Sequence, residues 1–473
     1  MQNIINPGDV SRRAFLRGSL LTAGALALGR AYAAPGRVSA RRVLPGAKLN
    51  IAFVGLGGQG GNNLGSIYGL GENIVALCDV DQTRLQTAAK KVQERCPNAR
   101  QYADFRVMFE RERDLDAVLI STPDHMHAVV AMWAMQRGLN VYCEKPLTRT
   151  AWEARELLRL ARQSGVVTQM GNHGSASEGL RHGVEVLRAG VIGNVREAHV
   201  WTDRPKWPQG IARPAGADPV PPTLDWDLWL GVAPERPYKA KVYHPFVWRG
   251  WHDFGAGALG DMGCHTLNLP FHGLRLGSVT EVEAEERVTP MPETYPKGSR
   301  VRYTFAARGD LPALKLWWYE GAVRPQASIM TEIIATFAET PKSGCLLIGD
   351  KGLLYSPDDY GTKNYLLLKG EEKFMGLAKH PAAMAVPVTL PRAPGGRGGS
   401  HHREWTEACK GGPATFSNFE TAVPLTEICA VGCLALRLGK RIEWNAAAMT
   451  APNAPEAAPL IRPVYRKGWQ MCP

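Results

Sequence analysis

The sequence LNIAFVGLGGQG occupies residues 49–60 and decides the fold of the N-terminal half. Its first six residues form a short apolar run, which is typical of a buried parallel strand. A second apolar run, 73–78, ends in Asp79, 19 residues after Gly60. A GxGxxG turn alone is weak evidence, but after a strand, and with an acid ending the next strand, it predicts a dinucleotide site.

Each glycine of this turn has its own task. Gly55 permits the tight turn, Gly57 lets the backbone approach a pyrophosphate, and Gly60 lets the helix pack on the sheet. The phosphates would lie at the helix N-terminus, whose N–H groups and dipole favour anions. Asp79 would accept hydrogen bonds from ribose hydroxyls, which favours NAD. Arg84 could bind the additional phosphate of NADP, so NADP remains an alternative cofactor. A glycine-rich loop without a ligand is the alternative, which this context disfavours.

Strand and helix patterns alternate up to residue 172. Further buried strands are predicted at 116–121, 140–143 and 166–170, and helices at 81–95, 128–136 and 151–163, the last opened by a capping box at Thr150 and Glu153. This alternation indicates a doubly wound parallel sheet, so we expect an α/β fold with a Rossmann domain over 48–172.

The ligand of such a sheet lies outside the carboxyl ends of its strands. Three predicted loops end there, and they contain chemically active side chains. These loops are Ser121-Thr122-Pro123-Asp124-His125-Met126-His127, Glu144-Lys145-Pro146 and Gly171-Asn172-His173.

The pattern changes at about residue 195. Alternating segments at 196–201, 280–287 and 301–306 predict a large, open, mainly antiparallel sheet in an α+β domain over 173–445, before a tail over 446–473. Residues 205–250 form a Pro- and Trp-rich insertion that is long for a connection, which indicates a function. Six tryptophans fall between 201 and 251; they pack the insertion or, for one or two, form a platform for a sugar.

Asp261 and His265 lie four residues apart, so on a helix they share one face. A carboxylate beside an imidazole raises its basicity and fixes its tautomer, which suits a general base for a hydroxyl proton. Lys145 could stabilise the developing alkoxide. The pair could also be a structural hydrogen bond or half of a metal site, although two ligands are too few, and we expect no metal.

The first 33 residues predict a secretory signal. Paired arginines, Arg12-Arg13, precede Phe15-Leu16, an apolar stretch and the ending Ala31-Tyr32-Ala33. This order is similar to twin-arginine signals, which implies export of the folded protein by the twin-arginine machinery and a periplasmic location. An amphipathic helix with a chance arginine pair is the alternative. A linker is expected over 34–47.

Composition narrows the remaining classes. The 473 residues are 45% hydrophobic and 21% charged, which excludes a disordered chain. Loss of the signal, with four arginines and Asp9, takes the net charge from +12 to +9. The basic residues are dispersed, so we expect anionic ligands rather than nucleic acid. No stretch has the roughly 18 consecutive apolar residues of a membrane span, and nine cysteines without a CxxC pair predict no disulfide framework.

Together these motifs resemble the Gfo/Idh/MocA oxidoreductases, and the ending 455–469 resembles a bacterial branch with its own C-terminal domain. The resemblance rests on GLGGQG at 55–60, Asp79, Glu144-Lys145-Pro146 and Asp261-x-x-x-His265. It implies that Lys145, Asp261 and His265 are the catalytic residues, and it implies a homo-oligomer. The cofactor site it implies consists of Gly55, Gly57, Gly60, Asp79, Thr122, Pro123, His127, Glu144, Lys145 and Asn172.

The sequence therefore predicts an exported NAD(P)-dependent oxidoreductase for a hydroxyl group of a sugar or sugar derivative. Because no abundant nicotinamide pool is expected outside the cytoplasm, we expect a retained cofactor and a redox-neutral cycle. An NAD-dependent glycosidase or lyase, working through a transient keto-sugar, would use the same site. A sugar-binding protein without catalysis is the third hypothesis.

Overall fold

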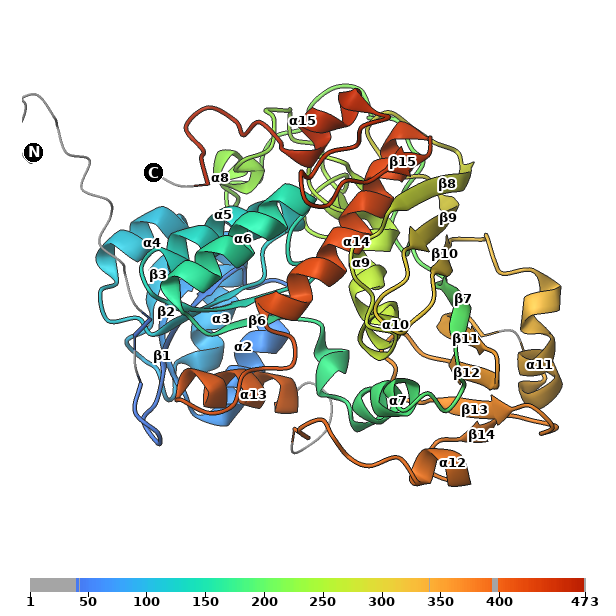
Figure 1. Ribbon diagram of the computed structural model, residues 1–473. Helices are drawn as coiled ribbons and strands as arrows, with labels where there is room; N and C mark the ends of the chain where they lie inside the picture. Colours follow the sequence, from blue (N-terminus) through green and yellow to red (C-terminus); the bar gives the residue numbers. More distant parts are fainter. Residues whose placement is uncertain (1–39, 42, 340, 394–398, 472–473) are drawn as a thin grey trace, which may run out of the picture. The chain divides into compact units, whose positions relative to one another are not determined.

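The computed structural model describes residues 40–471, apart from 42, 340 and 394–398 (Figure 1). The signal predicted over 1–33 lies outside the described residues, as does half of the linker predicted over 34–47. Export therefore stays a prediction.

The N-terminal half contains a six-stranded sheet in the order β3-β2-β1-β4-β5-β6, in which every pairing is parallel. Its strands are β1 (Asn50–Val54), β2 (Asn73–Cys78), β3 (Arg100–Tyr102), β4 (Ala117–Ile120), β5 (Asn140–Cys143) and β6 (Thr168–Met170). The chain runs outward from β1 to β3 and then reverses to β4, so β1 and β4 form the topological switch point at which such sheets bind ligands. The predicted Rossmann sheet is confirmed.

Helices cover both faces of this sheet (Figure 1). One face packs against α4 (Phe105–Arg111), α5 (Asp124–Met135) and α6 (Ala151–Ser164), and the other against α2 (Gln59–Leu70) and α3 (Gln82–Val92). Thr150 and Glu153 form the predicted capping box at the start of α6. Asp81 caps α3 by accepting a hydrogen bond from the backbone N–H of Thr83.

The second half contains a nine-stranded sheet in the order β14-β13-β12-β11-β7-β10-β9-β8-β15. Only the β7–β10 pairing is parallel among the described pairings. The strands are β7 (Val195–Trp201), β8 (Glu281–Val288), β9 (Gly298–Phe305), β10 (Leu314–Glu320), β11 (Gly344–Gly349), β12 (Gly352–Ser356), β13 (Tyr365–Leu368), β14 (Met375–Gly376) and β15 (Ile442–Glu443). The expected large, mainly antiparallel sheet is confirmed.

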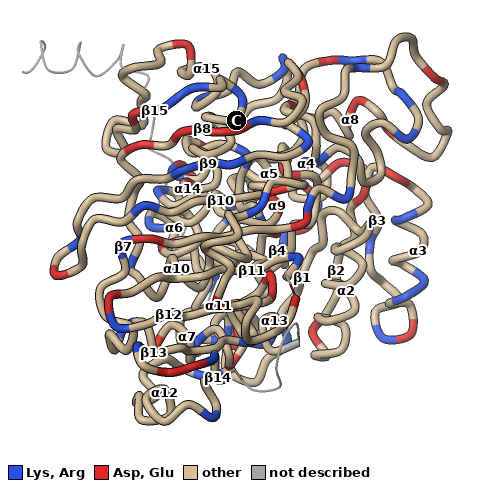
Figure 2. Tube along the Cα trace, turned by 90° about the vertical axis from the view of Figure 1, so that its right-hand side faces the viewer, with Lys and Arg blue, Asp and Glu red and all other residues tan. Residues whose placement is uncertain are grey.

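Charged side chains line the solvent side of strands β8 and β9. Arg302 on β9 lies 3.2 Å from Glu281 and 2.8 Å from Glu285, and it also pairs with Glu283. Figure 2 shows this arrangement as red segments of β8 beside blue segments of β9. These charged residues alternate along the strands with buried residues such as Val301 and Tyr303. One face of this part of the sheet is therefore exposed to solvent, and the other packs on the core.

Helices and short 3-10 turns complete the second half. They are η1 (His173–Ala176), α7 (Glu178–Arg188), α8 (Trp226–Leu230), η2 (Val247–Gly250), α9 (Gly257–Thr266), α10 (Asn268–Gly273), α11 (Ala327–Phe337), α12 (Pro381–Met384), α13 (Gly399–Cys409), α14 (Phe419–Leu438), η3 (Pro455–Ala457) and α15 (Ala458–Ile461). Helix α13 returns to the Rossmann domain, where the buried Trp405 joins the core beneath α2.

Helix α14 joins the two halves, because it packs against α6 on one side and α9 on the other (Figure 1). It is the one helix among the described residues that is long and apolar enough to cross a membrane. Of its most apolar window, 78% is buried inside the protein. Its apolar character is therefore that of a core helix at the junction that holds α9 against the Rossmann domain.

Candidate active site

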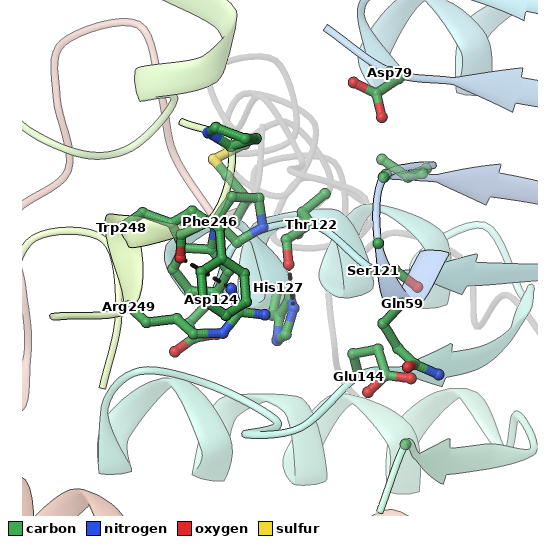
Figure 3. Close-up of a pocket in the computed structure, with 18 of the residues that line it drawn as sticks. Gln59, Asp79, Ser121, Thr122, Asp124, His127, Glu144, Phe246, Trp248 and Arg249 are labelled. Carbon is green, nitrogen blue, oxygen red and sulfur yellow. Dashed lines mark hydrogen bonds between the residues drawn. The ribbon is translucent and has the colours of Figure 1, made fainter. Parts of the chain in front are cut away.

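A cavity of about 750 Å³ lies outside the carboxyl ends of the parallel strands. Residues that directly follow strands of the Rossmann sheet form one wall, among them Gly55, Asp79, Thr122 and Lys145. Helix α9 and the insertion form the opposite wall. In Figure 3, Asp79 lies at one end of the cavity, and Trp248, Phe246 and Arg249 gather at the other.

At Gly55 and Gly60 of the glycine turn, nearby backbone leaves no room for a side chain. Gly55 has a φ of +87°, and a Cβ there would lie 2.6 Å from the carbonyl carbon and oxygen of Ser121. A Cβ on Gly60 would lie 2.1 Å from the carbonyl oxygen of Gly55. Beyond Gly58, α2 begins without a side-chain cap from the described residues, and its first residue, Gln59, lines the cavity. An uncapped helix N-terminus at a cavity fits a diphosphate.

Asp79 directly follows β2 and is 8% exposed. Its carboxylate accepts hydrogen bonds from the backbone N–H groups of Leu56, at 2.7 Å, and Asp81, at 2.9 Å. Each carboxylate oxygen can accept a second hydrogen bond, so both remain able to receive ribose hydroxyls. Burial raises the pKa of Asp79. Arg84 crosses the turn, since a Cβ on Gly57 would lie 1.8 Å from its guanidinium.

Lys145 and Asp261 join the two halves at the other end. The ammonium of Lys145 lies 2.7 Å from Oδ1 of Asp261 and 3.1 Å from its backbone carbonyl oxygen. Burial opposes the charged form of Lys145, but the Asp261 carboxylate outweighs it and raises the pKa of Lys145 above its usual range. Burial likewise opposes ionisation of Asp261, and Lys145 and Arg249 lower the pKa of Asp261 to about 2. Both groups are therefore charged at neutral pH.

His265 follows one turn later on α9, and it lines the same cavity. Its ring packs edge to face on Tyr360, at 4.8 Å between centroids, and its Nδ1 has no hydrogen-bond partner among the described residues. Burial and the nearby Lys145 ammonium lower the pKa of His265 well below its usual value. The imidazole is therefore neutral at physiological pH and able to accept a proton.

The sequence predicted that Asp261 orients His265 and raises its basicity. The structure corrects the first part of this prediction, because the Asp261 carboxylate pairs with Lys145 and lies 3.5 Å from Nε of Arg249 rather than holding the His265 ring. A buried carboxylate gains more from two cations than from a neutral ring. Asp261 does act on His265 in the predicted direction, but burial outweighs it and the net shift of the pKa is downward.

The turn after β4 fastens the Rossmann domain to the segment that leads into α9. The carboxylate of Asp124 accepts a hydrogen bond from the backbone N–H of Ala256, at 3.0 Å, directly before α9. The backbone N–H of His125 donates to the carbonyl of Phe254, at 3.2 Å. These two contacts position α9, and therefore Asp261, opposite the loop that carries Lys145.

His127 lines the cavity, but its ring nitrogens face backbone carbonyls. They lie 2.8 Å from the carbonyl oxygen of Pro146 and 2.9 Å from that of Thr122. Figure 3 shows the second contact. His127 thus connects the turn after β4 with the loop of Lys145. The hydroxyl of Thr122 is buried and has no partner within the described part of the chain, so it is available to a ligand.

Glu144 lies beside Lys145 and lines the cavity. Its Oε1 accepts a hydrogen bond from the amide of Asn63, at 2.8 Å, and lies 3.5 Å from Nε2 of His173. Burial opposes ionisation, but His173 and Asn63 lower the pKa of Glu144 to about 2. The cavity therefore contains a permanent negative charge next to Lys145.

Of the other predicted cofactor residues, Pro123 lines the cavity, whereas Gly60 and Asn172 do not. Gly60 packs α2 against the turn, as described above. The amide of Asn172 donates to the carbonyl of Cys264, at 3.4 Å, and its oxygen accepts a hydrogen bond from Ser417. The structure thus places Asn172 behind α9, where it ties β6 to that helix.

Arg249 and Asp124 are among the charged residues of the cavity that were not singled out from the sequence. The guanidinium of Arg249 lies over Trp248, at 4.2 Å, and over Phe246, at 4.5 Å. Burial raises the pKa of Asp124 to about 7, against the opposing effects of Arg249 and Lys145. The sequence signals were the carboxylate inside the predicted loop 121–127 and an arginine between tryptophans in the insertion.

Tryptophans of the insertion pack its core, as one interpretation predicted, whereas a platform for a sugar stays a prediction. Trp226 stacks on Trp229 at 4.7 Å, and Trp251 is fully buried in the core of the insertion. Trp229 also lines the cavity, together with Trp207 and Trp248. The same residues therefore pack the insertion and form part of the cavity wall.

Fold and cavity together are those of a protein with a Rossmann domain of the dinucleotide-binding class and a second domain built on a large sheet. Residues 49–172 match the oxidoreductase family with an NAD-binding Rossmann fold, and residues 206–277 match the C-terminal alpha/beta domain of the same family. Both matches are to domains of Gfo/Idh/MocA oxidoreductases, the family that the motifs predicted, and the match of the Rossmann domain is to its NAD-binding domain.

Curated relatives share part of the chain. The 2,7-anhydro-N-acetylneuraminate hydratase of Mediterraneibacter gnavus is 29% identical over 151 residues, which are 32% of this chain and 38% of that protein. Inositol 2-dehydrogenase of Salmonella typhimurium is 27% identical over 154 residues, which are 32% of this chain and 45% of that enzyme. The chain therefore spans less than half of the length of these relatives.

Solved structures show the same fold over most of the chain. The WlbA dehydrogenase of Bordetella pertussis, in complex with NADH and UDP-GlcNAcA, has a TM-score of 0.58 and 16% identity, with 84% of this chain and 99% of that chain covered. Levoglucosan dehydrogenase, in complex with NADH and levoglucosan, has a TM-score of 0.57 and 16% identity, with the same coverage.

Proposed function

We propose that this chain is an exported NAD(P)-dependent oxidoreductase that acts on a secondary hydroxyl group of a sugar or sugar derivative. The observation that carries the proposal is that Lys145, Asp261 and His265 line one cavity with the glycine turn. Relatives named as dehydrogenases of inositol and levoglucosan favour a polyhydroxylated substrate.

The cofactor fits this chain in two places. The uncapped start of α2 and the crowded glycine turn suit the diphosphate, and Asp79 suits the adenosine ribose. The unpartnered hydroxyl of Thr122 lies further along the same cavity, towards Lys145. Bound NAD would supply a hydride acceptor and donor at its nicotinamide.

Three side chains have separate tasks in the reaction that we propose. His265 is neutral, so it can take the hydroxyl proton of the substrate. The Lys145 ammonium is held in its charged form by Asp261, so it can stabilise the negative charge that develops on the substrate oxygen. Asp261 touches Lys145 and positions it.

The cycle is redox-neutral in this proposal. One substrate is oxidised and a second reduced, or the same substrate is oxidised and then restored, so the cofactor stays bound. We propose this cycle because the protein is expected to be exported, and a released cofactor could not readily be reoxidised outside the cytoplasm. The signal predicted over 1–33 supports export.

The first experiment identifies the bound nucleotide. Mature protein is purified without added cofactor and denatured, and the supernatant is analysed by mass spectrometry. NAD in near-stoichiometric amount is the expected result. An active preparation without nucleotide, which turns over only with excess exchangeable NAD, would contradict retention.

A sugar screen then tests the reaction. Candidate sugars, sugar acids and polyols are added to the loaded protein, and NADH fluorescence is followed. His265→Gln and Lys145→Ala should each lower turnover of an active sugar by about 10²-fold or more. His182→Gln, which changes a half-buried histidine on α7, is the matched control. Unchanged turnover with altered sugar affinity in His265→Gln would favour the binding protein.

A second candidate function is elimination, hydration or glycoside cleavage through a transient ketone. The relative named as a hydratase favours it. Oxidation of a hydroxyl to a ketone would acidify the neighbouring C–H, so that a base could remove this proton as the leaving group departs and a C=C bond forms. In elimination the double bond would remain, whereas in hydration or glycoside cleavage water would add across it. Reduction of the ketone by the hydride that the bound NAD took up, with a proton, would then restore the alcohol. Cleavage of a chromogenic glycoside without net NADH, lost in Lys145→Ala, would select this function.

Export and assembly belong to the same proposal. Lysine in place of Arg12 and Arg13 should leave the protein in the cytoplasm if the twin-arginine machinery exports it. Cell fractionation measures this outcome, and unchanged periplasmic yield would exclude that route. A homo-oligomer is the proposed assembly, and light scattering of the purified protein gives its mass.

A further inference from the structure

Two segments from outside the Rossmann domain reach the end of the cavity at which Asp79 lies. One is residues 223–244 of the insertion, which we call the strap, and the other is residues 466–469 of the C-terminal tail. Leu228 and His244 of the strap and Trp469 of the tail line the cavity together with Phe105. In a Rossmann domain the acid after β2 marks the adenosine half of the dinucleotide.

The strap is bonded to the backbone that directly follows Asp79. The N–H of Gln82 donates to the carbonyl of Thr223, at 2.8 Å, and the N–H of Asp225 donates to the carbonyl of Val80, at 3.0 Å. Backbone hydrogen bonds of this kind fix the register of the strap on the turn between β2 and α3.

A side-chain contact reinforces this attachment. Nε2 of His244 lies 3.1 Å from Oδ2 of Asp81, whose other oxygen caps α3. Arg84, which crosses the glycine turn, approaches the same Asp81 oxygen at 3.5 Å. His244 of the strap and Arg84, which crosses the glycine turn, therefore contact the same carboxylate.

The tail holds the strap from its other side. The backbone N–H of Arg466 donates to the carbonyl of Val232, at 3.1 Å, and Nε of Arg466 donates to the carbonyl of Gly231, at 2.9 Å. The guanidinium also pairs with Asp227 in α8. Figure 1 shows the end of the red tail beside the green helix α8.

Trp469 connects the tail back to the Rossmann domain. Its ring lies 4.2 Å from the guanidinium of Arg106 and 6.2 Å from the ring of Phe105, both at the start of α4. Only 9% of Trp469 is exposed. The turn after β2, the strap, the tail and α4 thus form a closed ring of contacts around the adenosine end.

We propose that the strap and the tail complete the adenosine subsite and set the rate at which the dinucleotide leaves. Release requires part of this ring to open, and such local opening is slower than escape from an open cleft. The inference rests on the proposed NAD-dependent function and explains how this chain would retain its cofactor.

The experiment measures cofactor release directly. Protein loaded with NADH is mixed with a large excess of NAD, and the loss of bound NADH fluorescence gives the release rate. Trp469→Ala and Arg466→Gln should each raise this rate at least about tenfold, which corresponds to about 1.4 kcal/mol. Trp469→Phe should restore most of the wild-type rate, because it retains a ring against Phe105.

The matched controls remove the same residue types elsewhere. Trp317→Ala changes a half-buried tryptophan on β10, and Arg441→Gln changes an exposed ion-pairing arginine beside β15. Both should release NADH at the wild-type rate. Release rates of Trp469→Ala and Arg466→Gln within twofold of wild type would overturn the proposal.

Hydrogen exchange on the wild-type protein gives a result that depends on no variant. NADH should slow exchange at 223–244 and 466–469, but not at the β12–β13 hairpin. Equal exchange with and without NADH in the strap and tail would also overturn the proposal. Wild-type protein that binds no NADH would instead refute the proposed function itself, so the two failures are distinguishable.

Discussion

The ammonium of Lys145 lies 2.7 Å from the carboxylate of Asp261, and this ion pair crosses the boundary between the Rossmann domain and α9. The two residues are 116 positions apart in the sequence. Their pairing keeps a buried ammonium charged and places it in the same cavity as His265. Four predictions follow from this geometry and from the elements that maintain it.

Asparagine in place of Asp261 should move the alkaline limit of activity to lower pH. The carboxylate now raises the pKa of Lys145, whereas burial and Arg249 both lower it. Without the carboxylate, Lys145 loses its proton at a lower pH, and kcat/KM at pH 9 should fall about 10²-fold. A pH–rate profile measures the shift, with the exposed Asp114→Asn as control. An unmoved alkaline limb would show that Asp261 does not maintain this charge.

The acid limit of activity should lie below pH 6.5. Burial and Lys145 lower the pKa of His265 well below 6.5, so the imidazole remains unprotonated and able to act as a base in mildly acidic solution. The rate should therefore stay level as the pH falls from 8 to 6.5. A rate that halves near pH 6.5 would contradict this prediction. If the His265→Gln variant then showed the same pH–rate profile, His265 would not be the general base.

Asparagine in place of Asp124 should stabilise the protein above pH 7. The folded pKa of about 7 exceeds the ordinary value of 3.8, so the folded state binds more protons between these values and loses stability as the pH rises through them. Asparagine can still accept the hydrogen bond from Ala256. The gain at pH 8 is at most about 4 kcal/mol and should vanish near pH 4.

Urea unfolding at both pH values measures this difference. Asp310→Asn, which changes an exposed aspartate in a turn, is the control and should give no gain. A stability difference between wild type and Asp124→Asn that is equal at pH 4 and pH 8 would contradict the raised pKa.

Alanine at Gly55 should be more harmful than alanine at Gly58. Both glycines have positive φ, of +87° and +51°, so each substitution costs about 1–2 kcal/mol of backbone strain. Only at Gly55 would the new Cβ also meet backbone, 2.6 Å away at Ser121, whereas at Gly58 nothing lies within 4 Å. Thermal unfolding and NADH titration compare the two. Equal losses would mean that the close approach to Ser121 is relieved without cost.

Much of the Rossmann domain could be predicted because its signals are local. The apolar run at 49–54, the glycine turn and the capping box at Thr150 each depend on residues within a few positions of one another. Their strands and helices lie within a few residues of the predicted bounds. The chain order of the loops also predicted that Thr122 and Lys145 face one cavity, since parallel strands end at the same edge.

Pairings between distant residues were less predictable. Spacing on α9 indicated that Asp261 would serve His265, but it carried no information on which cation would approach from the other domain. Asn172 was expected to bind the cofactor, but it does not line the cavity. Its side chain instead binds Ser417, a residue far along the chain that local patterns could not identify as a neighbour.

The sequence by itself determined the parallel sheet and its glycine turn, because strand pattern, turn chemistry and helix caps act over short stretches of chain. Only the tertiary structure decided that Asp261 belongs to Lys145, that burial keeps His265 neutral, and that Trp469 reaches Phe105. These outcomes depend on which charges and rings the packed domains bring together, and on the desolvation that packing imposes.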